Sequence, residues 1–167
     1  LKVFQPRTII EEMEYVDKDF IIDYSNYYAR SFPDIERFSS RYHLFSCSIT
    51  EDQLDNYLQD PGSHEATAGL EALKNEYLGF IILKPNIYKK RSIGRTLLRM
   101  YPKDTGSGDI RRYISDEYSV SLFGLDLKIR TLPFQPQDQA VGICATSSIW
   151  TSNYPLNNSF GAPPSHS

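Results

Sequence analysis

An almost unbroken apolar run, Tyr77-Leu78-Gly79-Phe80-Ile81-Ile82-Leu83, constrains the fold of this chain more than any other feature. The run is much too short to cross a bilayer, and its length is that of a β-strand. A strand with one solvated face alternates apolar and polar residues, whereas a continuous apolar run indicates a strand buried on both faces. The sequence therefore predicts a sheet in which Tyr77–Lys84 is a central strand.

Further segments have the alternation or the aromatic and β-branched content of strands. They are Ile9–Val16, Arg41–Ile49, Arg95–Tyr101, Tyr118–Phe123 and Leu125–Thr131. The last two segments are separated by a single glycine, Gly124, and should form a hairpin that turns there. In this hairpin Val120 and Leu122 are expected to face Leu127 and Ile129.

Helix signals lie mainly in the N-terminal half of the chain. Asp17 resembles an N-cap, with aromatic residues at helical spacing up to Phe32, and Thr50-Glu51-Asp52-Gln53 is a capping box for a helix through about Leu58. Further helices are expected over Ala66–Asn75 and Ala140–Trp150. The order of helices first and strands second predicts an α+β fold, with N-terminal helices packed on a mostly antiparallel sheet.

Composition limits the class of protein. The chain has 167 residues, of which 40% are hydrophobic, so one domain with a packed core, or one domain and the start of another, is expected. A net charge of -3 gives no general attraction to nucleic acid or to an acidic membrane. Two cysteines and no signal peptide favour the cytoplasm. The first residue is not Met, which suggests an excised piece, and no cofactor or metal site is expected.

The helix predicted over Ala140–Trp150 carries the residues with the clearest chemistry. Cys144 lies in its first turns, where the helix dipole favours thiolate over thiol, and small residues follow it. Gln137 and Gln139 precede the cysteine and could donate a side-chain amide to an oxyanion that forms beside the sulfur. These are the requirements of acyl transfer at a thiol.

This segment, Gln137-Asp138 followed by Cys144-Ala145-Thr146-Ser147-Ser148-Ile149-Trp150, resembles the nucleophile helix of the papain-like cysteine peptidase superfamily, in particular its C39-like bacterial branch. The resemblance implies Cys144 as nucleophile, with Gln137 as the first and Gln139 as the second candidate oxyanion donor, and a peptide or protein substrate. It also implies two regions: an N-terminal α+β region, 1–133, and the start of a papain-like catalytic domain, 134–167.

The histidine and the Asp or Asn of that family lie far downstream of the cysteine, beyond Ser167 in this numbering. A thiol without a base is a poor catalyst, so the chain as given is expected to be inactive as a peptidase. A second interpretation stays open. Cys144 would be a small core residue, and the chain would be a non-catalytic module for protein interaction or substrate recruitment.

Other residues give weaker signals. His43 is expected to be a packed strand residue, His64 a solvated loop residue, and His166 too close in sequence to Cys144 to serve as its base. The carboxylates between Glu11 and Asp19 are interpreted as a solvated face. The basic runs Tyr88–Arg91 and Arg111-Arg112 are expected in loops, where charge for solubility is the simpler account and nucleic-acid binding the alternative.

Overall fold

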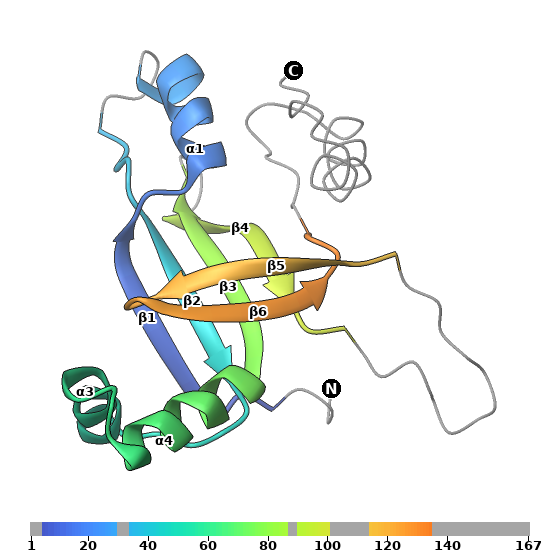
Figure 1. Cartoon of the computed structure of the whole chain (residues 1–167). Coiled ribbons are helices and arrows are strands. Elements are labelled where there is room, and N and C mark those ends of the chain that lie inside the picture. The colour runs from blue at the N-terminus through green and yellow to red at the C-terminus, as the bar shows by residue number, and fades with distance from the viewer. Residues whose placement is uncertain (1–4, 30–33, 87–89, 101–113, 135–167) are drawn as a thin grey trace. The chain divides into compact units, whose positions relative to one another are not determined.

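The computed structural model describes residues 5–29, 34–86, 90–100 and 114–134 (Figure 1). The chain divides into two compact units. Unit 1 comprises Leu1–Ile10, His43–Gly79 and Leu98–Thr131, and unit 2 comprises Glu11–Tyr42, Phe80–Leu97 and Leu132–Ser167. The division runs through the strands of the larger sheet, so each of these strands contributes residues to both units.

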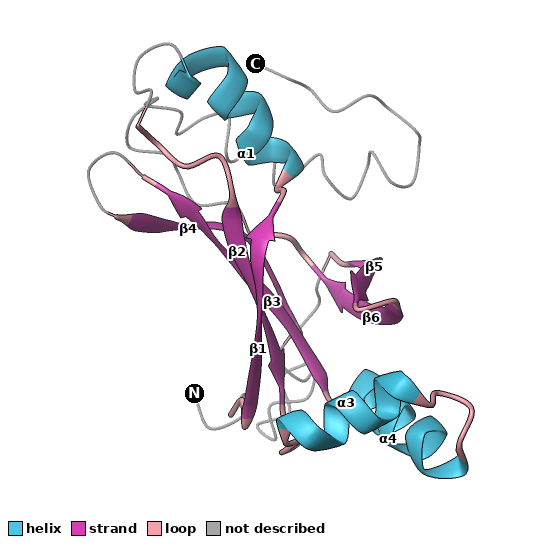
Figure 2. Ribbon diagram, turned by 90° about the vertical axis from the view of Figure 1, so that its left-hand side faces the viewer, coloured by secondary structure: helices cyan, strands magenta, loops and turns pink. Residues whose placement is uncertain are grey.

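The larger sheet has four strands in the order β1-β2-β3-β4 (Figure 2). Their bounds are β1 Thr8–Tyr15, β2 Ser39–Phe45, β3 Tyr77–Pro85 and β4 Arg91–Leu98. Strand β3 is interior, and most of its residues are buried on both faces, as the continuous apolar run predicted. Strand β1 lies at one edge and carries three glutamates, which are common on edge strands.

Strand β3 contains a break in its alternation at Gly79, whose φ of 117° is a conformation that side chains rarely adopt. Tyr77 contacts His43 and Phe45 of β2, whereas Phe80 contacts Arg41 of the same strand. Arg41, His43 and Phe45 share one face of β2, because side chains alternate with a period of two. Tyr77 and Phe80 therefore face the same side with two residues between them, as in a β-bulge.

Unit 1 contains a pair of short helices, α3 (Glu51–Gln59) and α4 (His64–Asn75), which lie side by side (Figures 1 and 2). The predicted capping box is confirmed, because Thr50 and Gln53 satisfy each other's backbone groups. Helix α4 buries Ala66, Leu70 and Leu73 and packs against the β5–β6 hairpin described below. These side chains, together with Tyr77 and the inward residues of the hairpin, form the core of unit 1.

Unit 2 contains helix α1 (Lys18–Asp23), which continues into a wider turn, η1 (Tyr24–Tyr28). Asp17 is its N-cap, as predicted, and accepts a hydrogen bond from the backbone N–H of Phe20 at 2.8 Å. Among the described residues of unit 2, the buried apolar side chains are Phe20, Phe80, Ile82 and Leu97, together with Pro85 and Pro133. Several buried polar side chains lie in the same described part and are considered with the candidate site.

The hairpin of β5 (Asp116–Leu122) and β6 (Leu125–Thr131) forms a separate two-stranded antiparallel sheet. Val120 pairs with Leu127 as predicted, while Ile129 pairs with Tyr118 and Leu122 with Leu125. Phe123 and Gly124 form the turn, with φ values of 51° and 84°. Two positive φ values define a type I′ turn, whose twist matches that of the strands and which usually begins with Asn or Asp.

Replacing Phe123 with asparagine should stabilise the chain by about 1 kcal/mol, because asparagine tolerates the left-handed conformation that strains a phenylalanine. The ring is 55% exposed, so little packing is lost. Urea denaturation measures the change. Phe123→Ala is the matched control, since it removes the ring but keeps the strained Cβ, and it should give no gain. A lower stability of Phe123→Asn would show that the ring packs.

The predicted fold class is wrong. The described residues form six strands in two antiparallel sheets and three short helices, which is not the papain-like arrangement of helices on a sheet. A strand, β1, precedes every helix, and the helices lie between strands instead of before them. The helix predicted after Asp17 is confirmed as far as the structure describes it, because helical backbone continues through α1 and η1 to Ala29. Its predicted end at Phe32 lies outside the described residues. The helix predicted over Ala140–Trp150 lies outside the described residues.

Candidate functional site

The three residues predicted to carry acyl transfer, Cys144, Gln137 and Gln139, all lie outside the described residues. Their assignment therefore stays a prediction, as does the boundary between regions 1–133 and 134–167. His166 also lies outside this part of the chain, as do Arg111 and Arg112. The described residues instead place the other cysteine, two histidines and most of the carboxylates considered above.

Cys47 follows β2 and is a free, partly buried thiol. Its backbone carbonyl accepts a hydrogen bond from the Thr8 hydroxyl at 2.9 Å, which holds this position against β1. Burial raises the pKa of the Cys47 thiol above its usual value of 9.0, and the negative charge of Glu76 raises it further. Because the thiolate is the nucleophile, Cys47 is a weak one at neutral pH.

His43 is fully enclosed in β2, with no exposed surface. Its Nδ1 atom is 3.0 Å from the hydroxyl of Tyr77, and the two rings lie 5.9 Å apart. A side chain enclosed in this way cannot meet a substrate, so His43 is the packed strand residue that the sequence predicted. His64 is exposed, but it is the first residue of α4 and not part of the preceding loop.

The interpretation of the early carboxylates as a solvated face is wrong for Glu12. The Arg41 guanidinium is 2.6 Å from the Glu12 carboxylate. It also lies over the rings of Tyr15 and Phe80, at 4.2 and 5.5 Å from their centroids. Arg41 is almost wholly buried, and a buried guanidinium requires a charged partner. Glu12 therefore faces the interior of unit 2.

The same interpretation is wrong for Asp17. This residue is only 3% exposed, and its carboxylate lies 3.7 Å from the Arg95 guanidinium. Asp19 lies 3.5 Å from the other terminal nitrogen of Arg95. The two carboxylates thus share one guanidinium, and Asp17 also caps α1. The cluster lies within unit 2 and joins α1 to β4, which indicates a structural role.

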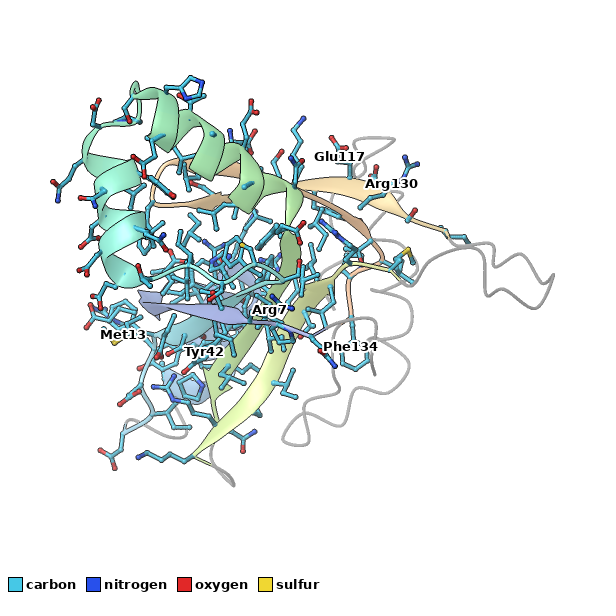
Figure 3. The ribbon with its side chains drawn as sticks, turned by 90° about the horizontal axis from the view of Figure 1, so that it is seen from below. Arg7, Met13, Tyr42, Glu117, Arg130 and Phe134 are labelled. Atoms are coloured by element: carbon cyan, nitrogen blue, oxygen red, sulfur yellow. The ribbon has the colours of Figure 1, made fainter. Side chains whose placement is uncertain are left out.

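Glu11, Met13 and Glu14 of β1 remain exposed and form the candidate site. Glu11 accepts a hydrogen bond from the Tyr42 hydroxyl at 2.7 Å, so both side chains lie on the outer face of the sheet. Met13 shares this face with Glu11 by alternation and is 75% exposed; Figure 3 shows Met13 and Tyr42 on the neighbouring strands. Val16, just after the strand, is 56% exposed.

Sequence reasoning missed this surface because it treated the glutamates as one group. The signal that distinguishes them is the alternation of Ile9, Glu11 and Met13 against Ile10 and Glu12. An apolar residue on each face of a predicted strand indicates that neither face is simply solvated. The exposed Met13 and Glu11 are therefore available to a partner.

Arg91, predicted in a basic loop, begins β4. Its guanidinium lies 3.6 Å from the Glu36 carboxylate and donates a hydrogen bond to the Ser40 hydroxyl at 2.9 Å. The positive charge of Arg91 is therefore partly compensated by Glu36. In the described part of the chain, no three His, Cys, Asp or Glu side chains gather as metal ligands. No helix there has the length and apolar character needed to cross a membrane.

Comparisons with protein-family models, with curated proteins and with solved structures give no match.

Proposed function

We propose that this chain belongs to a cysteine hydrolase in which Cys144 is the thiol nucleophile. The observation that carries the proposal is the segment from Gln137 to Trp150, where a glutamine precedes a cysteine followed by small residues. The proposal concerns this segment alone and not a papain-like fold for the described strands. We also propose that the protein works in a reducing compartment such as the cytoplasm, where both thiols stay free.

In this proposal Cys144 attacks the carbonyl carbon of a peptide or related amide and forms a thioester after the amine leaves. The Gln137 side-chain amide donates a hydrogen bond to the oxyanion, with Gln139 as the second candidate for this role. A histidine would carry the proton from the thiol to the leaving amine. Neither described histidine is assigned this role, since His43 is enclosed and His64 lies on α4.

The chain contains an internal reference for thiol reactivity. Cys144 should react with iodoacetamide at pH 7 at least tenfold faster than Cys47, because the pKa of Cys47 is raised by burial and an activated thiol has a lowered pKa. Rates are measured by mass spectrometry on Cys47→Ser and Cys144→Ser variants. The Cys47 rate should rise with pH and should not yet level off at pH 9.0, because burial raises the pKa of this thiol above that value. Equal rates for the two thiols at pH 7 would argue against the nucleophile.

A second candidate function, recruitment of a peptide, is favoured by the exposed apolar residues of β1. Ile9 and Met13 are 57% and 75% exposed on an edge strand, where apolar side chains promote pairing with another chain. Affinity selection from a mixed peptide library, read by mass spectrometry, tests this candidate. Selection of no peptide over a blank support would reject it.

A further inference from the structure

Strand β1 is the first strand in the order of its sheet, and no described strand pairs with its outer edge. The backbone N–H of Arg7, just before β1, donates to the carbonyl of Phe45 in β2 at 2.8 Å, so this N–H points toward β2. Backbone groups alternate in direction along a strand. The N–H groups of Thr8 and Ile10 therefore point away from β2.

The side chains of this edge give it a definite chemistry. The Glu12 carboxylate pairs with Arg41, whereas Glu11 and Glu14 are exposed. The described hydrogen-bond partner of Glu11, the Tyr42 phenol, carries no charge. Met13 lies between the two exposed carboxylates in sequence. The edge thus combines outward-pointing backbone groups, an exposed apolar side chain and exposed negative charge.

Glu14 limits the length of this edge. Its φ of 54° is a left-handed conformation, which interrupts the extended backbone just before β1 ends. The regular part of the strand therefore runs from Thr8 to Met13. A strand of this length can pair with an extended segment of about five or six residues, which is typical of strand addition.

We propose that the outer edge of β1 binds an extended peptide segment that alternates basic and apolar residues, which adds to the sheet as a fifth strand. Backbone hydrogen bonds to β1 give affinity, and lysines or arginines near Glu11 and Glu14 select the sequence. This inference rests on the peptide-recruiting candidate and names its site and ligand. It is independent of the chemistry assigned to Cys144.

The probe is a ten-residue peptide of alternating lysine and valine, acetylated and amidated, with binding measured by fluorescence anisotropy. A second peptide is N-methylated at every residue, which keeps its charge but removes the donors of both edges. The unmodified peptide should bind at least tenfold more tightly than the N-methylated one. Equal binding of the two would show charge attraction only and would overturn the proposal.

Variants locate the site on the protein. Glu11→Gln and Glu14→Gln should each weaken binding about two- to fivefold, the effect of one surface charge. Glu117→Gln is the matched control: it changes the net charge equally, but Glu117 lies on the β5–β6 hairpin, in an exposed pair with Lys128. Ile10→Pro removes one outward N–H and should also weaken binding. If Glu117→Gln weakens binding as much as the other two substitutions, the assignment to β1 fails.

Peptides of alternating serine and valine separate this inference from the recruiting candidate itself. They should bind at least fivefold more weakly than the lysine peptide. Equal binding of the neutral peptide, still lost on N-methylation, would overturn the basic ligand while leaving peptide recruitment in place. Loss of all peptide binding, including that of the mixed library, would reject both.

Discussion

Replacing Tyr77 with alanine should lower the free energy of unfolding by about 3–5 kcal/mol, enough to unfold a chain of ordinary stability. Tyr77 has no exposed surface and is the largest fully buried side chain among the described residues. Its ring packs on Phe45, with centroids 5.3 Å apart, and on His43. Loss of the ring leaves a cavity at the start of β3, where this strand continues from α4.

A second substitution separates packing from hydrogen bonding at the same position. Tyr77→Phe keeps the ring and removes only the hydroxyl that lies 3.0 Å from His43, so it should cost about 1–3 kcal/mol. Urea denaturation with circular dichroism measures both variants. A loss for phenylalanine as large as that for alanine would show that the hydroxyl, and not the ring, holds this part of the core.

Asp17→Ala should cost about 2–4 kcal/mol, because one carboxylate has two functions. It caps α1 through the N–H of Phe20, and loss of an N-cap typically costs about 1 kcal/mol. It also lies beside the guanidinium of Arg95, whose side chain is only 15% exposed. Removing one partner of a largely buried ion pair destabilises a protein further, although Asp19 still offsets part of the charge.

Two control substitutions separate the contribution of the helix cap from that of the ion pair with Arg95. Asp17→Asn keeps a good N-cap and removes only the charge, so it should cost less than Asp17→Ala. Thr50→Ala removes the exposed cap of α3, where no ion pair is involved, and should cost about 1 kcal/mol. Thermal unfolding followed by circular dichroism compares the three variants. If Asp17→Ala costs no more than Thr50→Ala, the Arg95 pair contributes nothing.

Local signals predicted the elements of this fold better than their arrangement. The caps at Asp17 and Thr50, the central strand and the turn at Gly124 depend on neighbouring residues, and each was predicted. The bulge at Gly79 could not be, since its position depends on which residues of β2 lie opposite. The helix after Asp17 was predicted as well, but aromatic spacing does not show that its second part, η1, is wider than an α-helix.

The candidate sites show the same difference between local and long-range signals. The assignment of Cys144, Gln137 and Gln139 came from a local motif and stays a prediction, since these residues lie outside the described part of the chain. The ion pair of Arg41 with Glu12 joins residues 29 positions apart. The ion pair of Arg95 with Asp17 joins β4 to the start of α1. Periodicity along one strand shows which residues share a face, but not which charges meet across the sheet.

The connection between β2 and β3 has its two ends close together. The backbone N–H of Ser46 donates to the carbonyl of Glu76 at 3.0 Å, so the residues between them, including α3 and α4, leave and re-enter the sheet at one place. The turn at Pro61 and Gly62, between the helices, is exposed. A guest protein inserted there would leave the separation of β2 and β3 unchanged, because the cost of closing a loop increases only slowly with its length. This turn is therefore the natural position for a fluorescent reporter within the folded chain.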